Sequence, residues 1–194
     1  MSDLAPASAD YSGMQGDIIA FFDAASRTAS RSVNALMTAS YWEIGRRILE
    51  FEQGGQDRAT YGEALIQRLS ADLTRCFGRG FSPRNIEQMR QFYQCWPAEQ
   101  IRQTLSGKLA TGKIPQTVSA ELTSSLISQT PSALSADLPA LAQAFPLPWS
   151  AYVRLLSVKN EMARAFYETE ALRGGWSVRQ LDRQIGSQFY ERTA

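Results

Sequence analysis

The sequence of 194 residues is long enough to bury one substantial core and too short for two large domains. Its 44% hydrophobic and 20% charged residues exclude an intrinsically disordered chain, and the absence of histidine excludes Ser-His-Asp triads and histidine-ligated metals. The net charge is only +1, but residues 75–119 carry 7 basic and 2 acidic side chains, an imbalance that favours a polyanionic partner.

The N-terminal part of the chain predicts one or two long helices. Residues 1–12 contain little to bury, and we expect them to form a disordered lead-in to a single domain that spans residues 13–194. From Asp17 onward, apolar residues recur at steps of three and four positions, which is typical of an amphipathic helix. Gly54 and Gly55 favour helix termination, so we expect the segment to end there.

Two further helices follow. Thr60–Phe77 has an apolar stripe with charged residues outside it, and a glycine turn at residues 78–80 ends the segment. Ser82 is a favoured N-cap residue and Pro83 suits the first helical position, so a third helix begins here. Its predicted buried stripe is Ile86, Met89, Tyr93 and Trp96.

Residues 98–148 differ in composition, because Ser, Thr, Ala, Gln and five prolines dominate them. We expect a largely peripheral insertion with short helical pieces around Ile101–Leu109 and Ala133–Phe145. Regular structure resumes at Trp149. Three short helices are predicted there, with apolar stripes made of Tyr152, Leu155 and Leu156, of Met162, Phe166 and Tyr167, and of Val178, Leu181, Ile185 and Phe189.

The predicted architecture is mainly α. Residues 60–96 and 149–192 each have an apolar stripe that needs a partner, so we expect them to pack together under the long N-terminal helix.

One local pattern occurs twice. Residues 80–87 and 175–182 both read Gly, aromatic, Ser, any residue, Arg, amide, aliphatic, acid, and each follows a helix and a short glycine turn. This is the outline of a helix-turn-helix. Arg and Gln side chains pair bidentately with guanine and adenine, so the pattern predicts a DNA-facing surface. The predicted nucleic-acid-binding residues are Arg84, Asn85, Arg90, Arg179, Gln180, Arg183 and Gln184. The alternative interpretation is that both helices are ordinary capped surface helices.

Other motifs argue against an enzyme. Cys76 and Cys95 alone cannot complete a zinc site, and we interpret them as buried, inert thiols. Residues 107–113 match the spacing of a phosphate-binding loop, but Ile114 stands where a hydroxyl should bind magnesium. No lysine follows an acidic residue at the spacing of the acid-x-Lys nuclease signature. We therefore predict no cofactor, no metal, no small-molecule substrate and no catalytic residue.

The chain also lacks the sequence features of a membrane or secreted protein. No apolar run approaches the roughly 20 residues that span a bilayer. The N-terminus has neither the positive flank nor the apolar run of a signal peptide. We expect a cytoplasmic protein.

Several strings resemble the N-terminal domain of the bacterial YhcG family, also known as domain of unknown function 1016. They are residues 41–48 (YWEIGRRI), residues 81–85 (FSPRN) followed by residues 89–93 (MRQFY), and the stretch from Trp149 to Arg192. The resemblance covers most of residues 30–97 and 147–192, and is only loose over residues 98–148. It implies a helical, winged-helix-like module that binds DNA and that precedes a nuclease domain of the PD-(D/E)XK superfamily in full-length members. The chain ends at Ala194, where that nuclease domain would begin.

Together these observations predict a non-catalytic DNA-binding module of a YhcG-type nuclease system. The alternative from another class is a protein-interaction module, in which the helices form a homodimer or dock a separately encoded nuclease. Long amphipathic helices favour this alternative, whereas the arginine-rich segments favour DNA.

Overall fold

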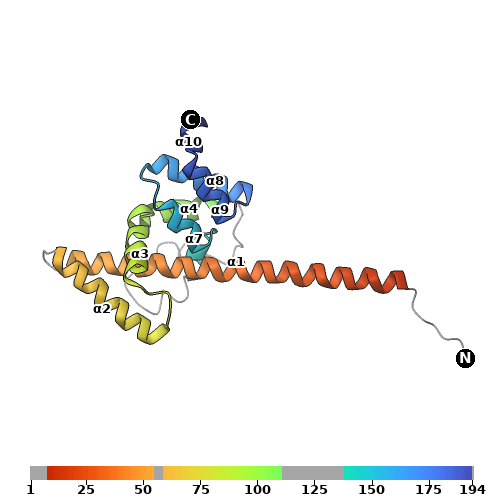
Figure 1. Ribbon diagram of the computed structural model, residues 1–194, viewed down its shortest axis with the longest axis horizontal. Coiled ribbons are helices and arrows are strands. Elements are labelled where there is room, and N and C mark those ends of the chain that lie inside the picture. The colour runs from red at the N-terminus through yellow and green to blue at the C-terminus, as the bar shows by residue number, and fades with distance from the viewer. Residues whose placement is uncertain (1–7, 55–58, 111–137, 194) are drawn as a thin grey trace, which may run out of the picture.

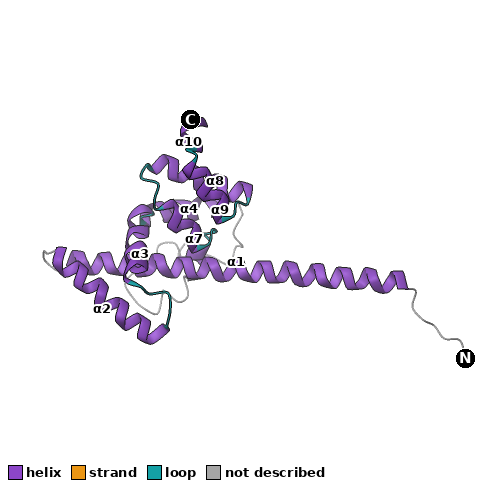
Figure 2. Ribbon diagram, in the orientation of Figure 1, coloured by secondary structure: helices purple, strands orange, loops and turns teal. Residues whose placement is uncertain are grey.

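The computed structural model describes residues 8–54, 59–110 and 138–193, and every regular element within these ranges is a helix (Figures 1 and 2). In chain order the helices are α1 (Ser8–Gly54), α2 (Ala59–Phe77), α3 (Pro83–Cys95), α4 (Ala98–Ala110), α7 (Trp149–Leu155), α8 (Glu161–Gly174), α9 (Val178–Gly186) and α10 (Phe189–Thr193), with a helical stretch at 138–142 before α7. The mainly α class is confirmed. The described ranges contain no strand and therefore no β-hairpin wing.

α1 is a single helix of 47 residues, so the choice between one helix and two is settled in favour of one. At 1.5 Å per residue it is about 70 Å long. Its N-terminal part projects beyond the body of the molecule, and residues 11–34 are all exposed (Figure 1). Residues 8–12 are already helical, so the predicted lead-in over residues 1–12 is too long; residues 1–7 lie outside the described ranges. Only the C-terminal part of α1 covers the core.

The second and third helices match the predicted bounds to within one residue, because their local signals are strong. Ser82 caps α3 by accepting a hydrogen bond from the backbone N–H of Asn85, and Pro83 is the first helical residue. Gly78 and Gly80 adopt φ values of 81° and 117°, a region that residues with a Cβ seldom enter. The chain therefore turns sharply between α2 and α3.

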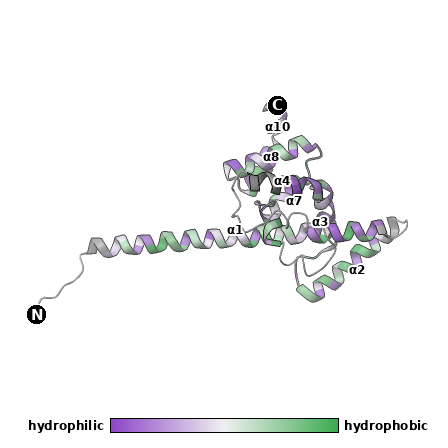
Figure 3. Cartoon of the chain, turned by 180° about the vertical axis from the view of Figure 1, so that it is seen from behind, coloured by the Kyte–Doolittle hydropathy of each residue, from purple (hydrophilic) through white to green (hydrophobic). Residues whose placement is uncertain are grey.

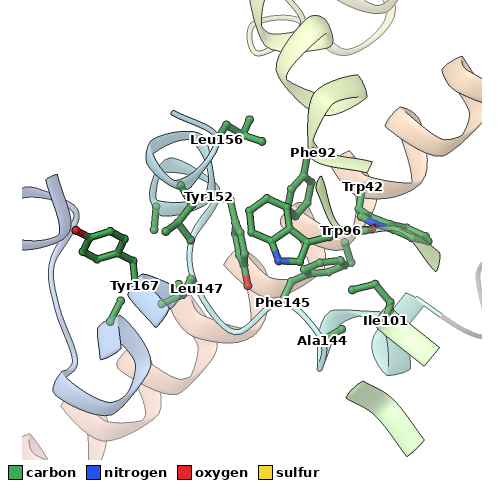
Figure 4. Close-up of a cluster of buried hydrophobic side chains, with 14 of the residues drawn as sticks. Trp42, Phe92, Trp96, Ile101, Ala144, Phe145, Leu147, Tyr152, Leu156 and Tyr167 are labelled. Atoms are coloured by element: carbon green, nitrogen blue, oxygen red, sulfur yellow. The ribbon is translucent and has the colours of Figure 1, made fainter. Parts of the chain in front are cut away.

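The main core lies where α3 crosses between α1 and α7. Phe92 is fully buried, and its ring contacts those of Trp96, Phe145 and Tyr152 at centroid distances of 5.0–5.1 Å (Figure 4). The predicted stripe of α3 contained Tyr93 in place of Phe92, and Tyr93 is only half-buried. The prediction was wrong at this position because α3 is enclosed from two sides, so its buried face is wider than one stripe.

The described parts of residues 98–148 are not peripheral, so this prediction is also wrong. α4 and residues 138–147 bring large apolar side chains into the main core, namely Ile101, Leu105, Leu141, Phe145 and Leu147. Residues 138–147 also contact α1, since the ring of Phe145 lies 6.0 Å from that of Trp42. The composition misled the prediction because a few large apolar side chains suffice to fill a core among many small polar residues. Part of the predicted piece around Ala133–Phe145 is helical at 138–142; residues 111–137 lie outside the described ranges.

The C-terminal helices pack against α7. Tyr167, Ala171 and Leu181 are buried between α8 and α9. Met162, predicted to be part of the stripe of α8, is 72% exposed, because the face that α8 buries is formed by Ala163, Tyr167 and Ala171 at steps of four residues. The last predicted helix is interrupted at Gln188, whose φ of 52° separates α9 from α10.

Candidate nucleic-acid interface

The two copies of the repeated pattern form two similar local structures. We call α2, the turn at 78–82 and α3 the first unit, and α8, the turn at 175–177 and α9 the second unit. In each, a glycine with positive φ ends one helix and a serine side chain caps the next. The helix, turn and capped helix that the sequence predicts are therefore present twice.

In the second unit, α9 exposes its basic face. Leu181 is its one buried residue and points toward the core, whereas Arg179 and Arg183 are exposed on successive turns. Neither arginine forms an ion pair with any residue that the structure describes. The side of α9 that faces away from the core therefore carries two cations that are available to an external anion.

The two glutamines of α9 differ in their surroundings. The side-chain oxygen of Gln180 accepts hydrogen bonds from the backbone N–H and from the hydroxyl of Ser177, both at 2.8 Å, which completes the predicted capping box. Reading adenine bidentately requires both the oxygen and the nitrogen of an amide, so Gln180 would have to leave this cap to do so. Gln184 is half-buried, and its backbone carbonyl accepts a hydrogen bond from Tyr167.

In the first unit, most of the predicted residues are engaged within the protein. Asn85 donates to the carbonyl oxygen of Gly80 at 2.5 Å and accepts from the indole N–H of Trp149 at 2.9 Å. Arg90 lies 3.4 Å from Glu52 at the C-terminal part of α1. Arg84, by contrast, is exposed and has no ion pair within the described ranges. Of the predicted residues of the first unit, only Arg84 is therefore available to an external anion.

α7 connects the two units. Trp149 at its start binds Asn85 of α3, and Arg154 near its end lies 3.3 Å from Asp182 of α9. These two positions are about 8 Å apart along the helix axis. The Arg154–Asp182 pair is half-exposed and contributes little stability, but Arg154 offsets the carboxylate that lies between the two arginines of α9.

The sequence did not indicate the buried polar network that supports this arrangement. Glu168 of α8 accepts hydrogen bonds from the indole of Trp96 at 2.9 Å and from the hydroxyl of Tyr152 at 3.0 Å. Arg164 lies over the ring of Trp96 at 5.1 Å and donates to the carbonyl of Val158. Burial, with a smaller contribution from Glu168, raises the pKa of Tyr152 well above its usual value, so the hydroxyl stays a donor. Tyr152 and Trp96, the two donors to Glu168, lie 16 and 72 residues away from it in the chain, and no local sequence pattern indicates these contacts.

The two cysteines do not match the interpretation as buried thiols. Cys76 is exposed at the end of α2, and Cys95 is half-buried at the end of α3. Cys76 is exposed because α2 packs through one stripe only, and its last turn extends past that contact. Within the described ranges, no three Cys, Asp or Glu side chains gather as a metal site would require. None of the helices described here is both long and apolar enough to cross a lipid bilayer.

Comparison with known proteins assigns this chain to a family. The DUF1016 N-terminal domain matches residues 17–192. A protein of Escherichia coli (strain K12) named "Putative nuclease YhcG" is 58% identical over 192 residues, which cover 95% of this chain and 47% of that protein. The chain thus spans about half the length of this curated relative. No solved structure matches the chain significantly. The chain therefore belongs to the DUF1016 N-terminal domain family.

Proposed function

We propose that this domain binds DNA and has no catalytic activity of its own, serving a YhcG-type nuclease as its nucleic-acid recognition module. The observation that carries the proposal is the outer face of α9, where Arg179 and Arg183 are exposed without ion pairs among the described residues on a helix that follows a glycine turn. A recognition helix presents its first turns to the major groove in the same way.

The first unit adds a second contact point in this proposal. Arg84 lies in the first turn of α3, and α7 contacts both units, α3 through Trp149 and α9 through Arg154. Arginine suits this role because its planar fork binds phosphate oxygens or guanine bidentately. Asn85 and Arg90 would act mainly by positioning α3, given their contacts with Trp149 and Glu52.

The relative's name supports the connection with nucleic acid, since that protein is described as a nuclease. The proposal places cleavage outside this domain, because the chain lacks histidine and has no acid-x-Lys motif. DNA and a nuclease partner are the expected interaction partners, which agrees with the cytoplasmic location predicted from the sequence.

Binding is best tested by fluorescence anisotropy with a labelled duplex of about 30 base pairs at several salt concentrations. Phosphate contacts release counterions, so replacing an arginine that contacts phosphate lowers the slope of log affinity against log salt by about one unit. We expect this change for Arg84→Ala, Arg179→Ala and Arg183→Ala, and a smaller one for Arg90→Ala.

Arg173→Ala is the matched control. Arg173 is as exposed as the tested residues but is already paired with Glu170 at 3.0 Å on α8, so its loss should leave the slope unchanged. Unchanged slopes for all three test variants, with folding intact by circular dichroism, would contradict the proposed surface. Binding that does not depend on salt would favour a protein-interaction module.

The absence of catalysis has its own test. Plasmid DNA, linear DNA and RNA incubated with the purified chain and magnesium or manganese should stay uncut. Cleavage that disappears when a single carboxylate is replaced would refute this part of the proposal.

A further inference from the structure

The projecting half of α1 carries large apolar side chains that contact nothing else in the described structure. Tyr11, Met14, Ile18, Phe21 and Phe22 are 49–70% exposed. Figure 3 shows apolar residues recurring along this part of the helix. Most helical stability in proteins comes from packing of an apolar face, and this part of α1 has no such packing among the described residues. A partner for this face would therefore stabilise the helix itself.

The exposed residues follow the repeat of a coiled coil. Alternating steps of three and four residues join one continuous stripe, the α1 stripe, which consists of Tyr11, Met14, Ile18, Phe21, Ala25, Thr28, Ser32 and Ala35. The same repeat continues into Ala39 and Trp42, which are buried in the main core. The first four members are large and the last four are small. This asymmetry limits which partner fits.

We propose that the α1 stripe pairs with the same stripe of a second copy of this chain, in antiparallel orientation about a two-fold axis near residue 23. In this register each layer of the coiled coil combines one large and one small side chain, namely Tyr11 with Ala35, Met14 with Ser32, Ile18 with Thr28 and Phe21 with Ala25. A parallel pair would stack the large residues on each other and leave consecutive layers of small ones. Interdigitation of large with small side chains is the better packing.

The two hydroxyl side chains of the stripe can be buried without losing a hydrogen bond. The hydroxyl of Thr28 donates to the carbonyl of Ala24 at 2.9 Å, and that of Ser32 donates to the carbonyl of Thr28 at 3.1 Å. Both donors are thus satisfied within α1 itself, so covering them with an apolar side chain leaves no buried hydroxyl without a partner.

A pocket lies where this register needs one. An open, mainly apolar hollow of about 410 Å³ forms where α1 meets the body of the molecule. It is lined by Arg31, Ser32, Ala35, Leu36, Pro139, Ala142, Gln143 and Pro146. Ser32 and Ala35 face Met14 and Tyr11 of the second copy in the antiparallel pair. The two largest side chains near the N-terminus of one copy would therefore enter this hollow of the other.

The charged side chains beside the α1 stripe favour the same antiparallel register. Asp17 and Arg31 flank the stripe on one side, and the antiparallel pair places each beside the other residue of the second copy. Neither forms an ion pair with a described residue of its own chain. Shifting the contact to the neighbouring apolar residues Ile19 and Phe22 would bring Asp23 of one copy against Asp23 of the other. Like charges in that position are destabilising.

Sedimentation equilibrium of the full chain, without DNA, tests the pairing. We expect a monomer–dimer equilibrium in the micromolar range for the unmodified protein. Phe21→Glu removes a large residue from two symmetry-related layers and should raise the dissociation constant at least about 100-fold. Ser30→Glu is the matched control on the opposite side of α1 and should leave the dissociation constant unchanged. Because the substituted residues are exposed, neither change should affect folding of the body.

Exchanging the charges tests the orientation. Asp17→Arg alone and Arg31→Asp alone each create two repulsive pairs and should weaken the dimer about tenfold, whereas the double variant should restore it. A protein that stays monomeric at about 100 µM, a dimer insensitive to Phe21→Glu, or a double variant as weak as the singles would each overturn the proposal. None of these results bears on DNA binding, which is measured separately by its dependence on salt.

Discussion

The two units share an eight-residue pattern and a local geometry, but they occupy different places in the fold. α3 of the first unit is enclosed between α1 and α7 and buries Ile86, Met89 and Phe92. α9 of the second unit lies at the edge of the molecule and buries Leu181 alone. The same sequence pattern therefore builds a core helix in one place and a surface helix in the other.

The difference shows which part of the pattern is local and which depends on context. The glycine turn and the serine cap form in both units because each needs only neighbouring residues. The amide after the arginine takes different roles: Asn85 reaches across to Trp149, whereas Gln180 turns back to Ser177. Since α9 has fewer neighbours, its arginines stay available, and this makes the second unit the stronger candidate for DNA contact.

The largest expected effect on stability is at Gly45, where α1 crosses α3 and helps to bury the first unit. A Cβ on Gly45 of α1 would lie 2.8 Å from the carbonyl carbon of Met89 in α3 and closer still to its oxygen. Backbone cannot move aside as a flexible side chain can, so Gly45→Ala should destabilise the protein by about 3 kcal/mol. Urea denaturation followed by circular dichroism measures the change.

Gly16→Ala is the control on the same helix. A Cβ at this position has no atom within 4 Å, and alanine favours a helix by about 1 kcal/mol over glycine. This variant should raise the helix content slightly without lowering the urea midpoint. If Gly45→Ala behaved like Gly16→Ala, the close approach of α1 to α3 would be wrong, and with it the central position of the first unit.

A smaller effect should distinguish the two amides. Asn85→Ala removes both the acceptor of Trp149 and the donor to Gly80, and should cost about 1–2 kcal/mol. Gln180→Ala removes only part of an exposed cap and should cost about 0.5 kcal/mol. Equal losses for both alanine variants would show that the units are more alike than their burial suggests.

The parts of the structure that could be predicted from the sequence are those that depend on short-range chemistry. The bounds of α2 and α3, the cap at Ser82 and the capping box at Ser177 follow from residues within a few positions of each other. The helical character of the segment that ends at Gly54 also follows, because its apolar spacing is regular and no proline interrupts it, whereas the choice between one helix and two does not.

The remaining features depend on which elements meet in space. Phe92 is buried because α7 and residues 138–147 cover a second side of α3, and Asn85 is engaged because Trp149 lies beside it, 64 residues away in the chain. Periodicity also made the apolar residues of the projecting part of α1 resemble a core stripe, although nothing in the described structure covers them. The sequence singles out the arginines of the candidate site, but which of them are engaged within the protein depends on partners distant in the chain, as Glu52 is for Arg90.

The smallest expected effect concerns the two cysteine thiols of the first unit, one at the end of each of its helices. Cys76 is exposed at the end of α2, whereas burial raises the pKa of Cys95 at the end of α3. A raised pKa means less thiolate at a given pH, and the thiolate is the reactive form. At pH 8, a disulfide reagent such as Ellman's should therefore modify Cys76 at least about tenfold faster than Cys95. The rate of Cys95 modification should continue to rise at pH values above the usual range for thiols.

Two variants assign the phases: Cys76→Ser should remove the fast phase, and Cys95→Ala should remove the slow one. Two phases of equal rate would mean that the end of α3 is as open as the end of α2, and that the first unit is less deeply enclosed than its aromatic contacts indicate.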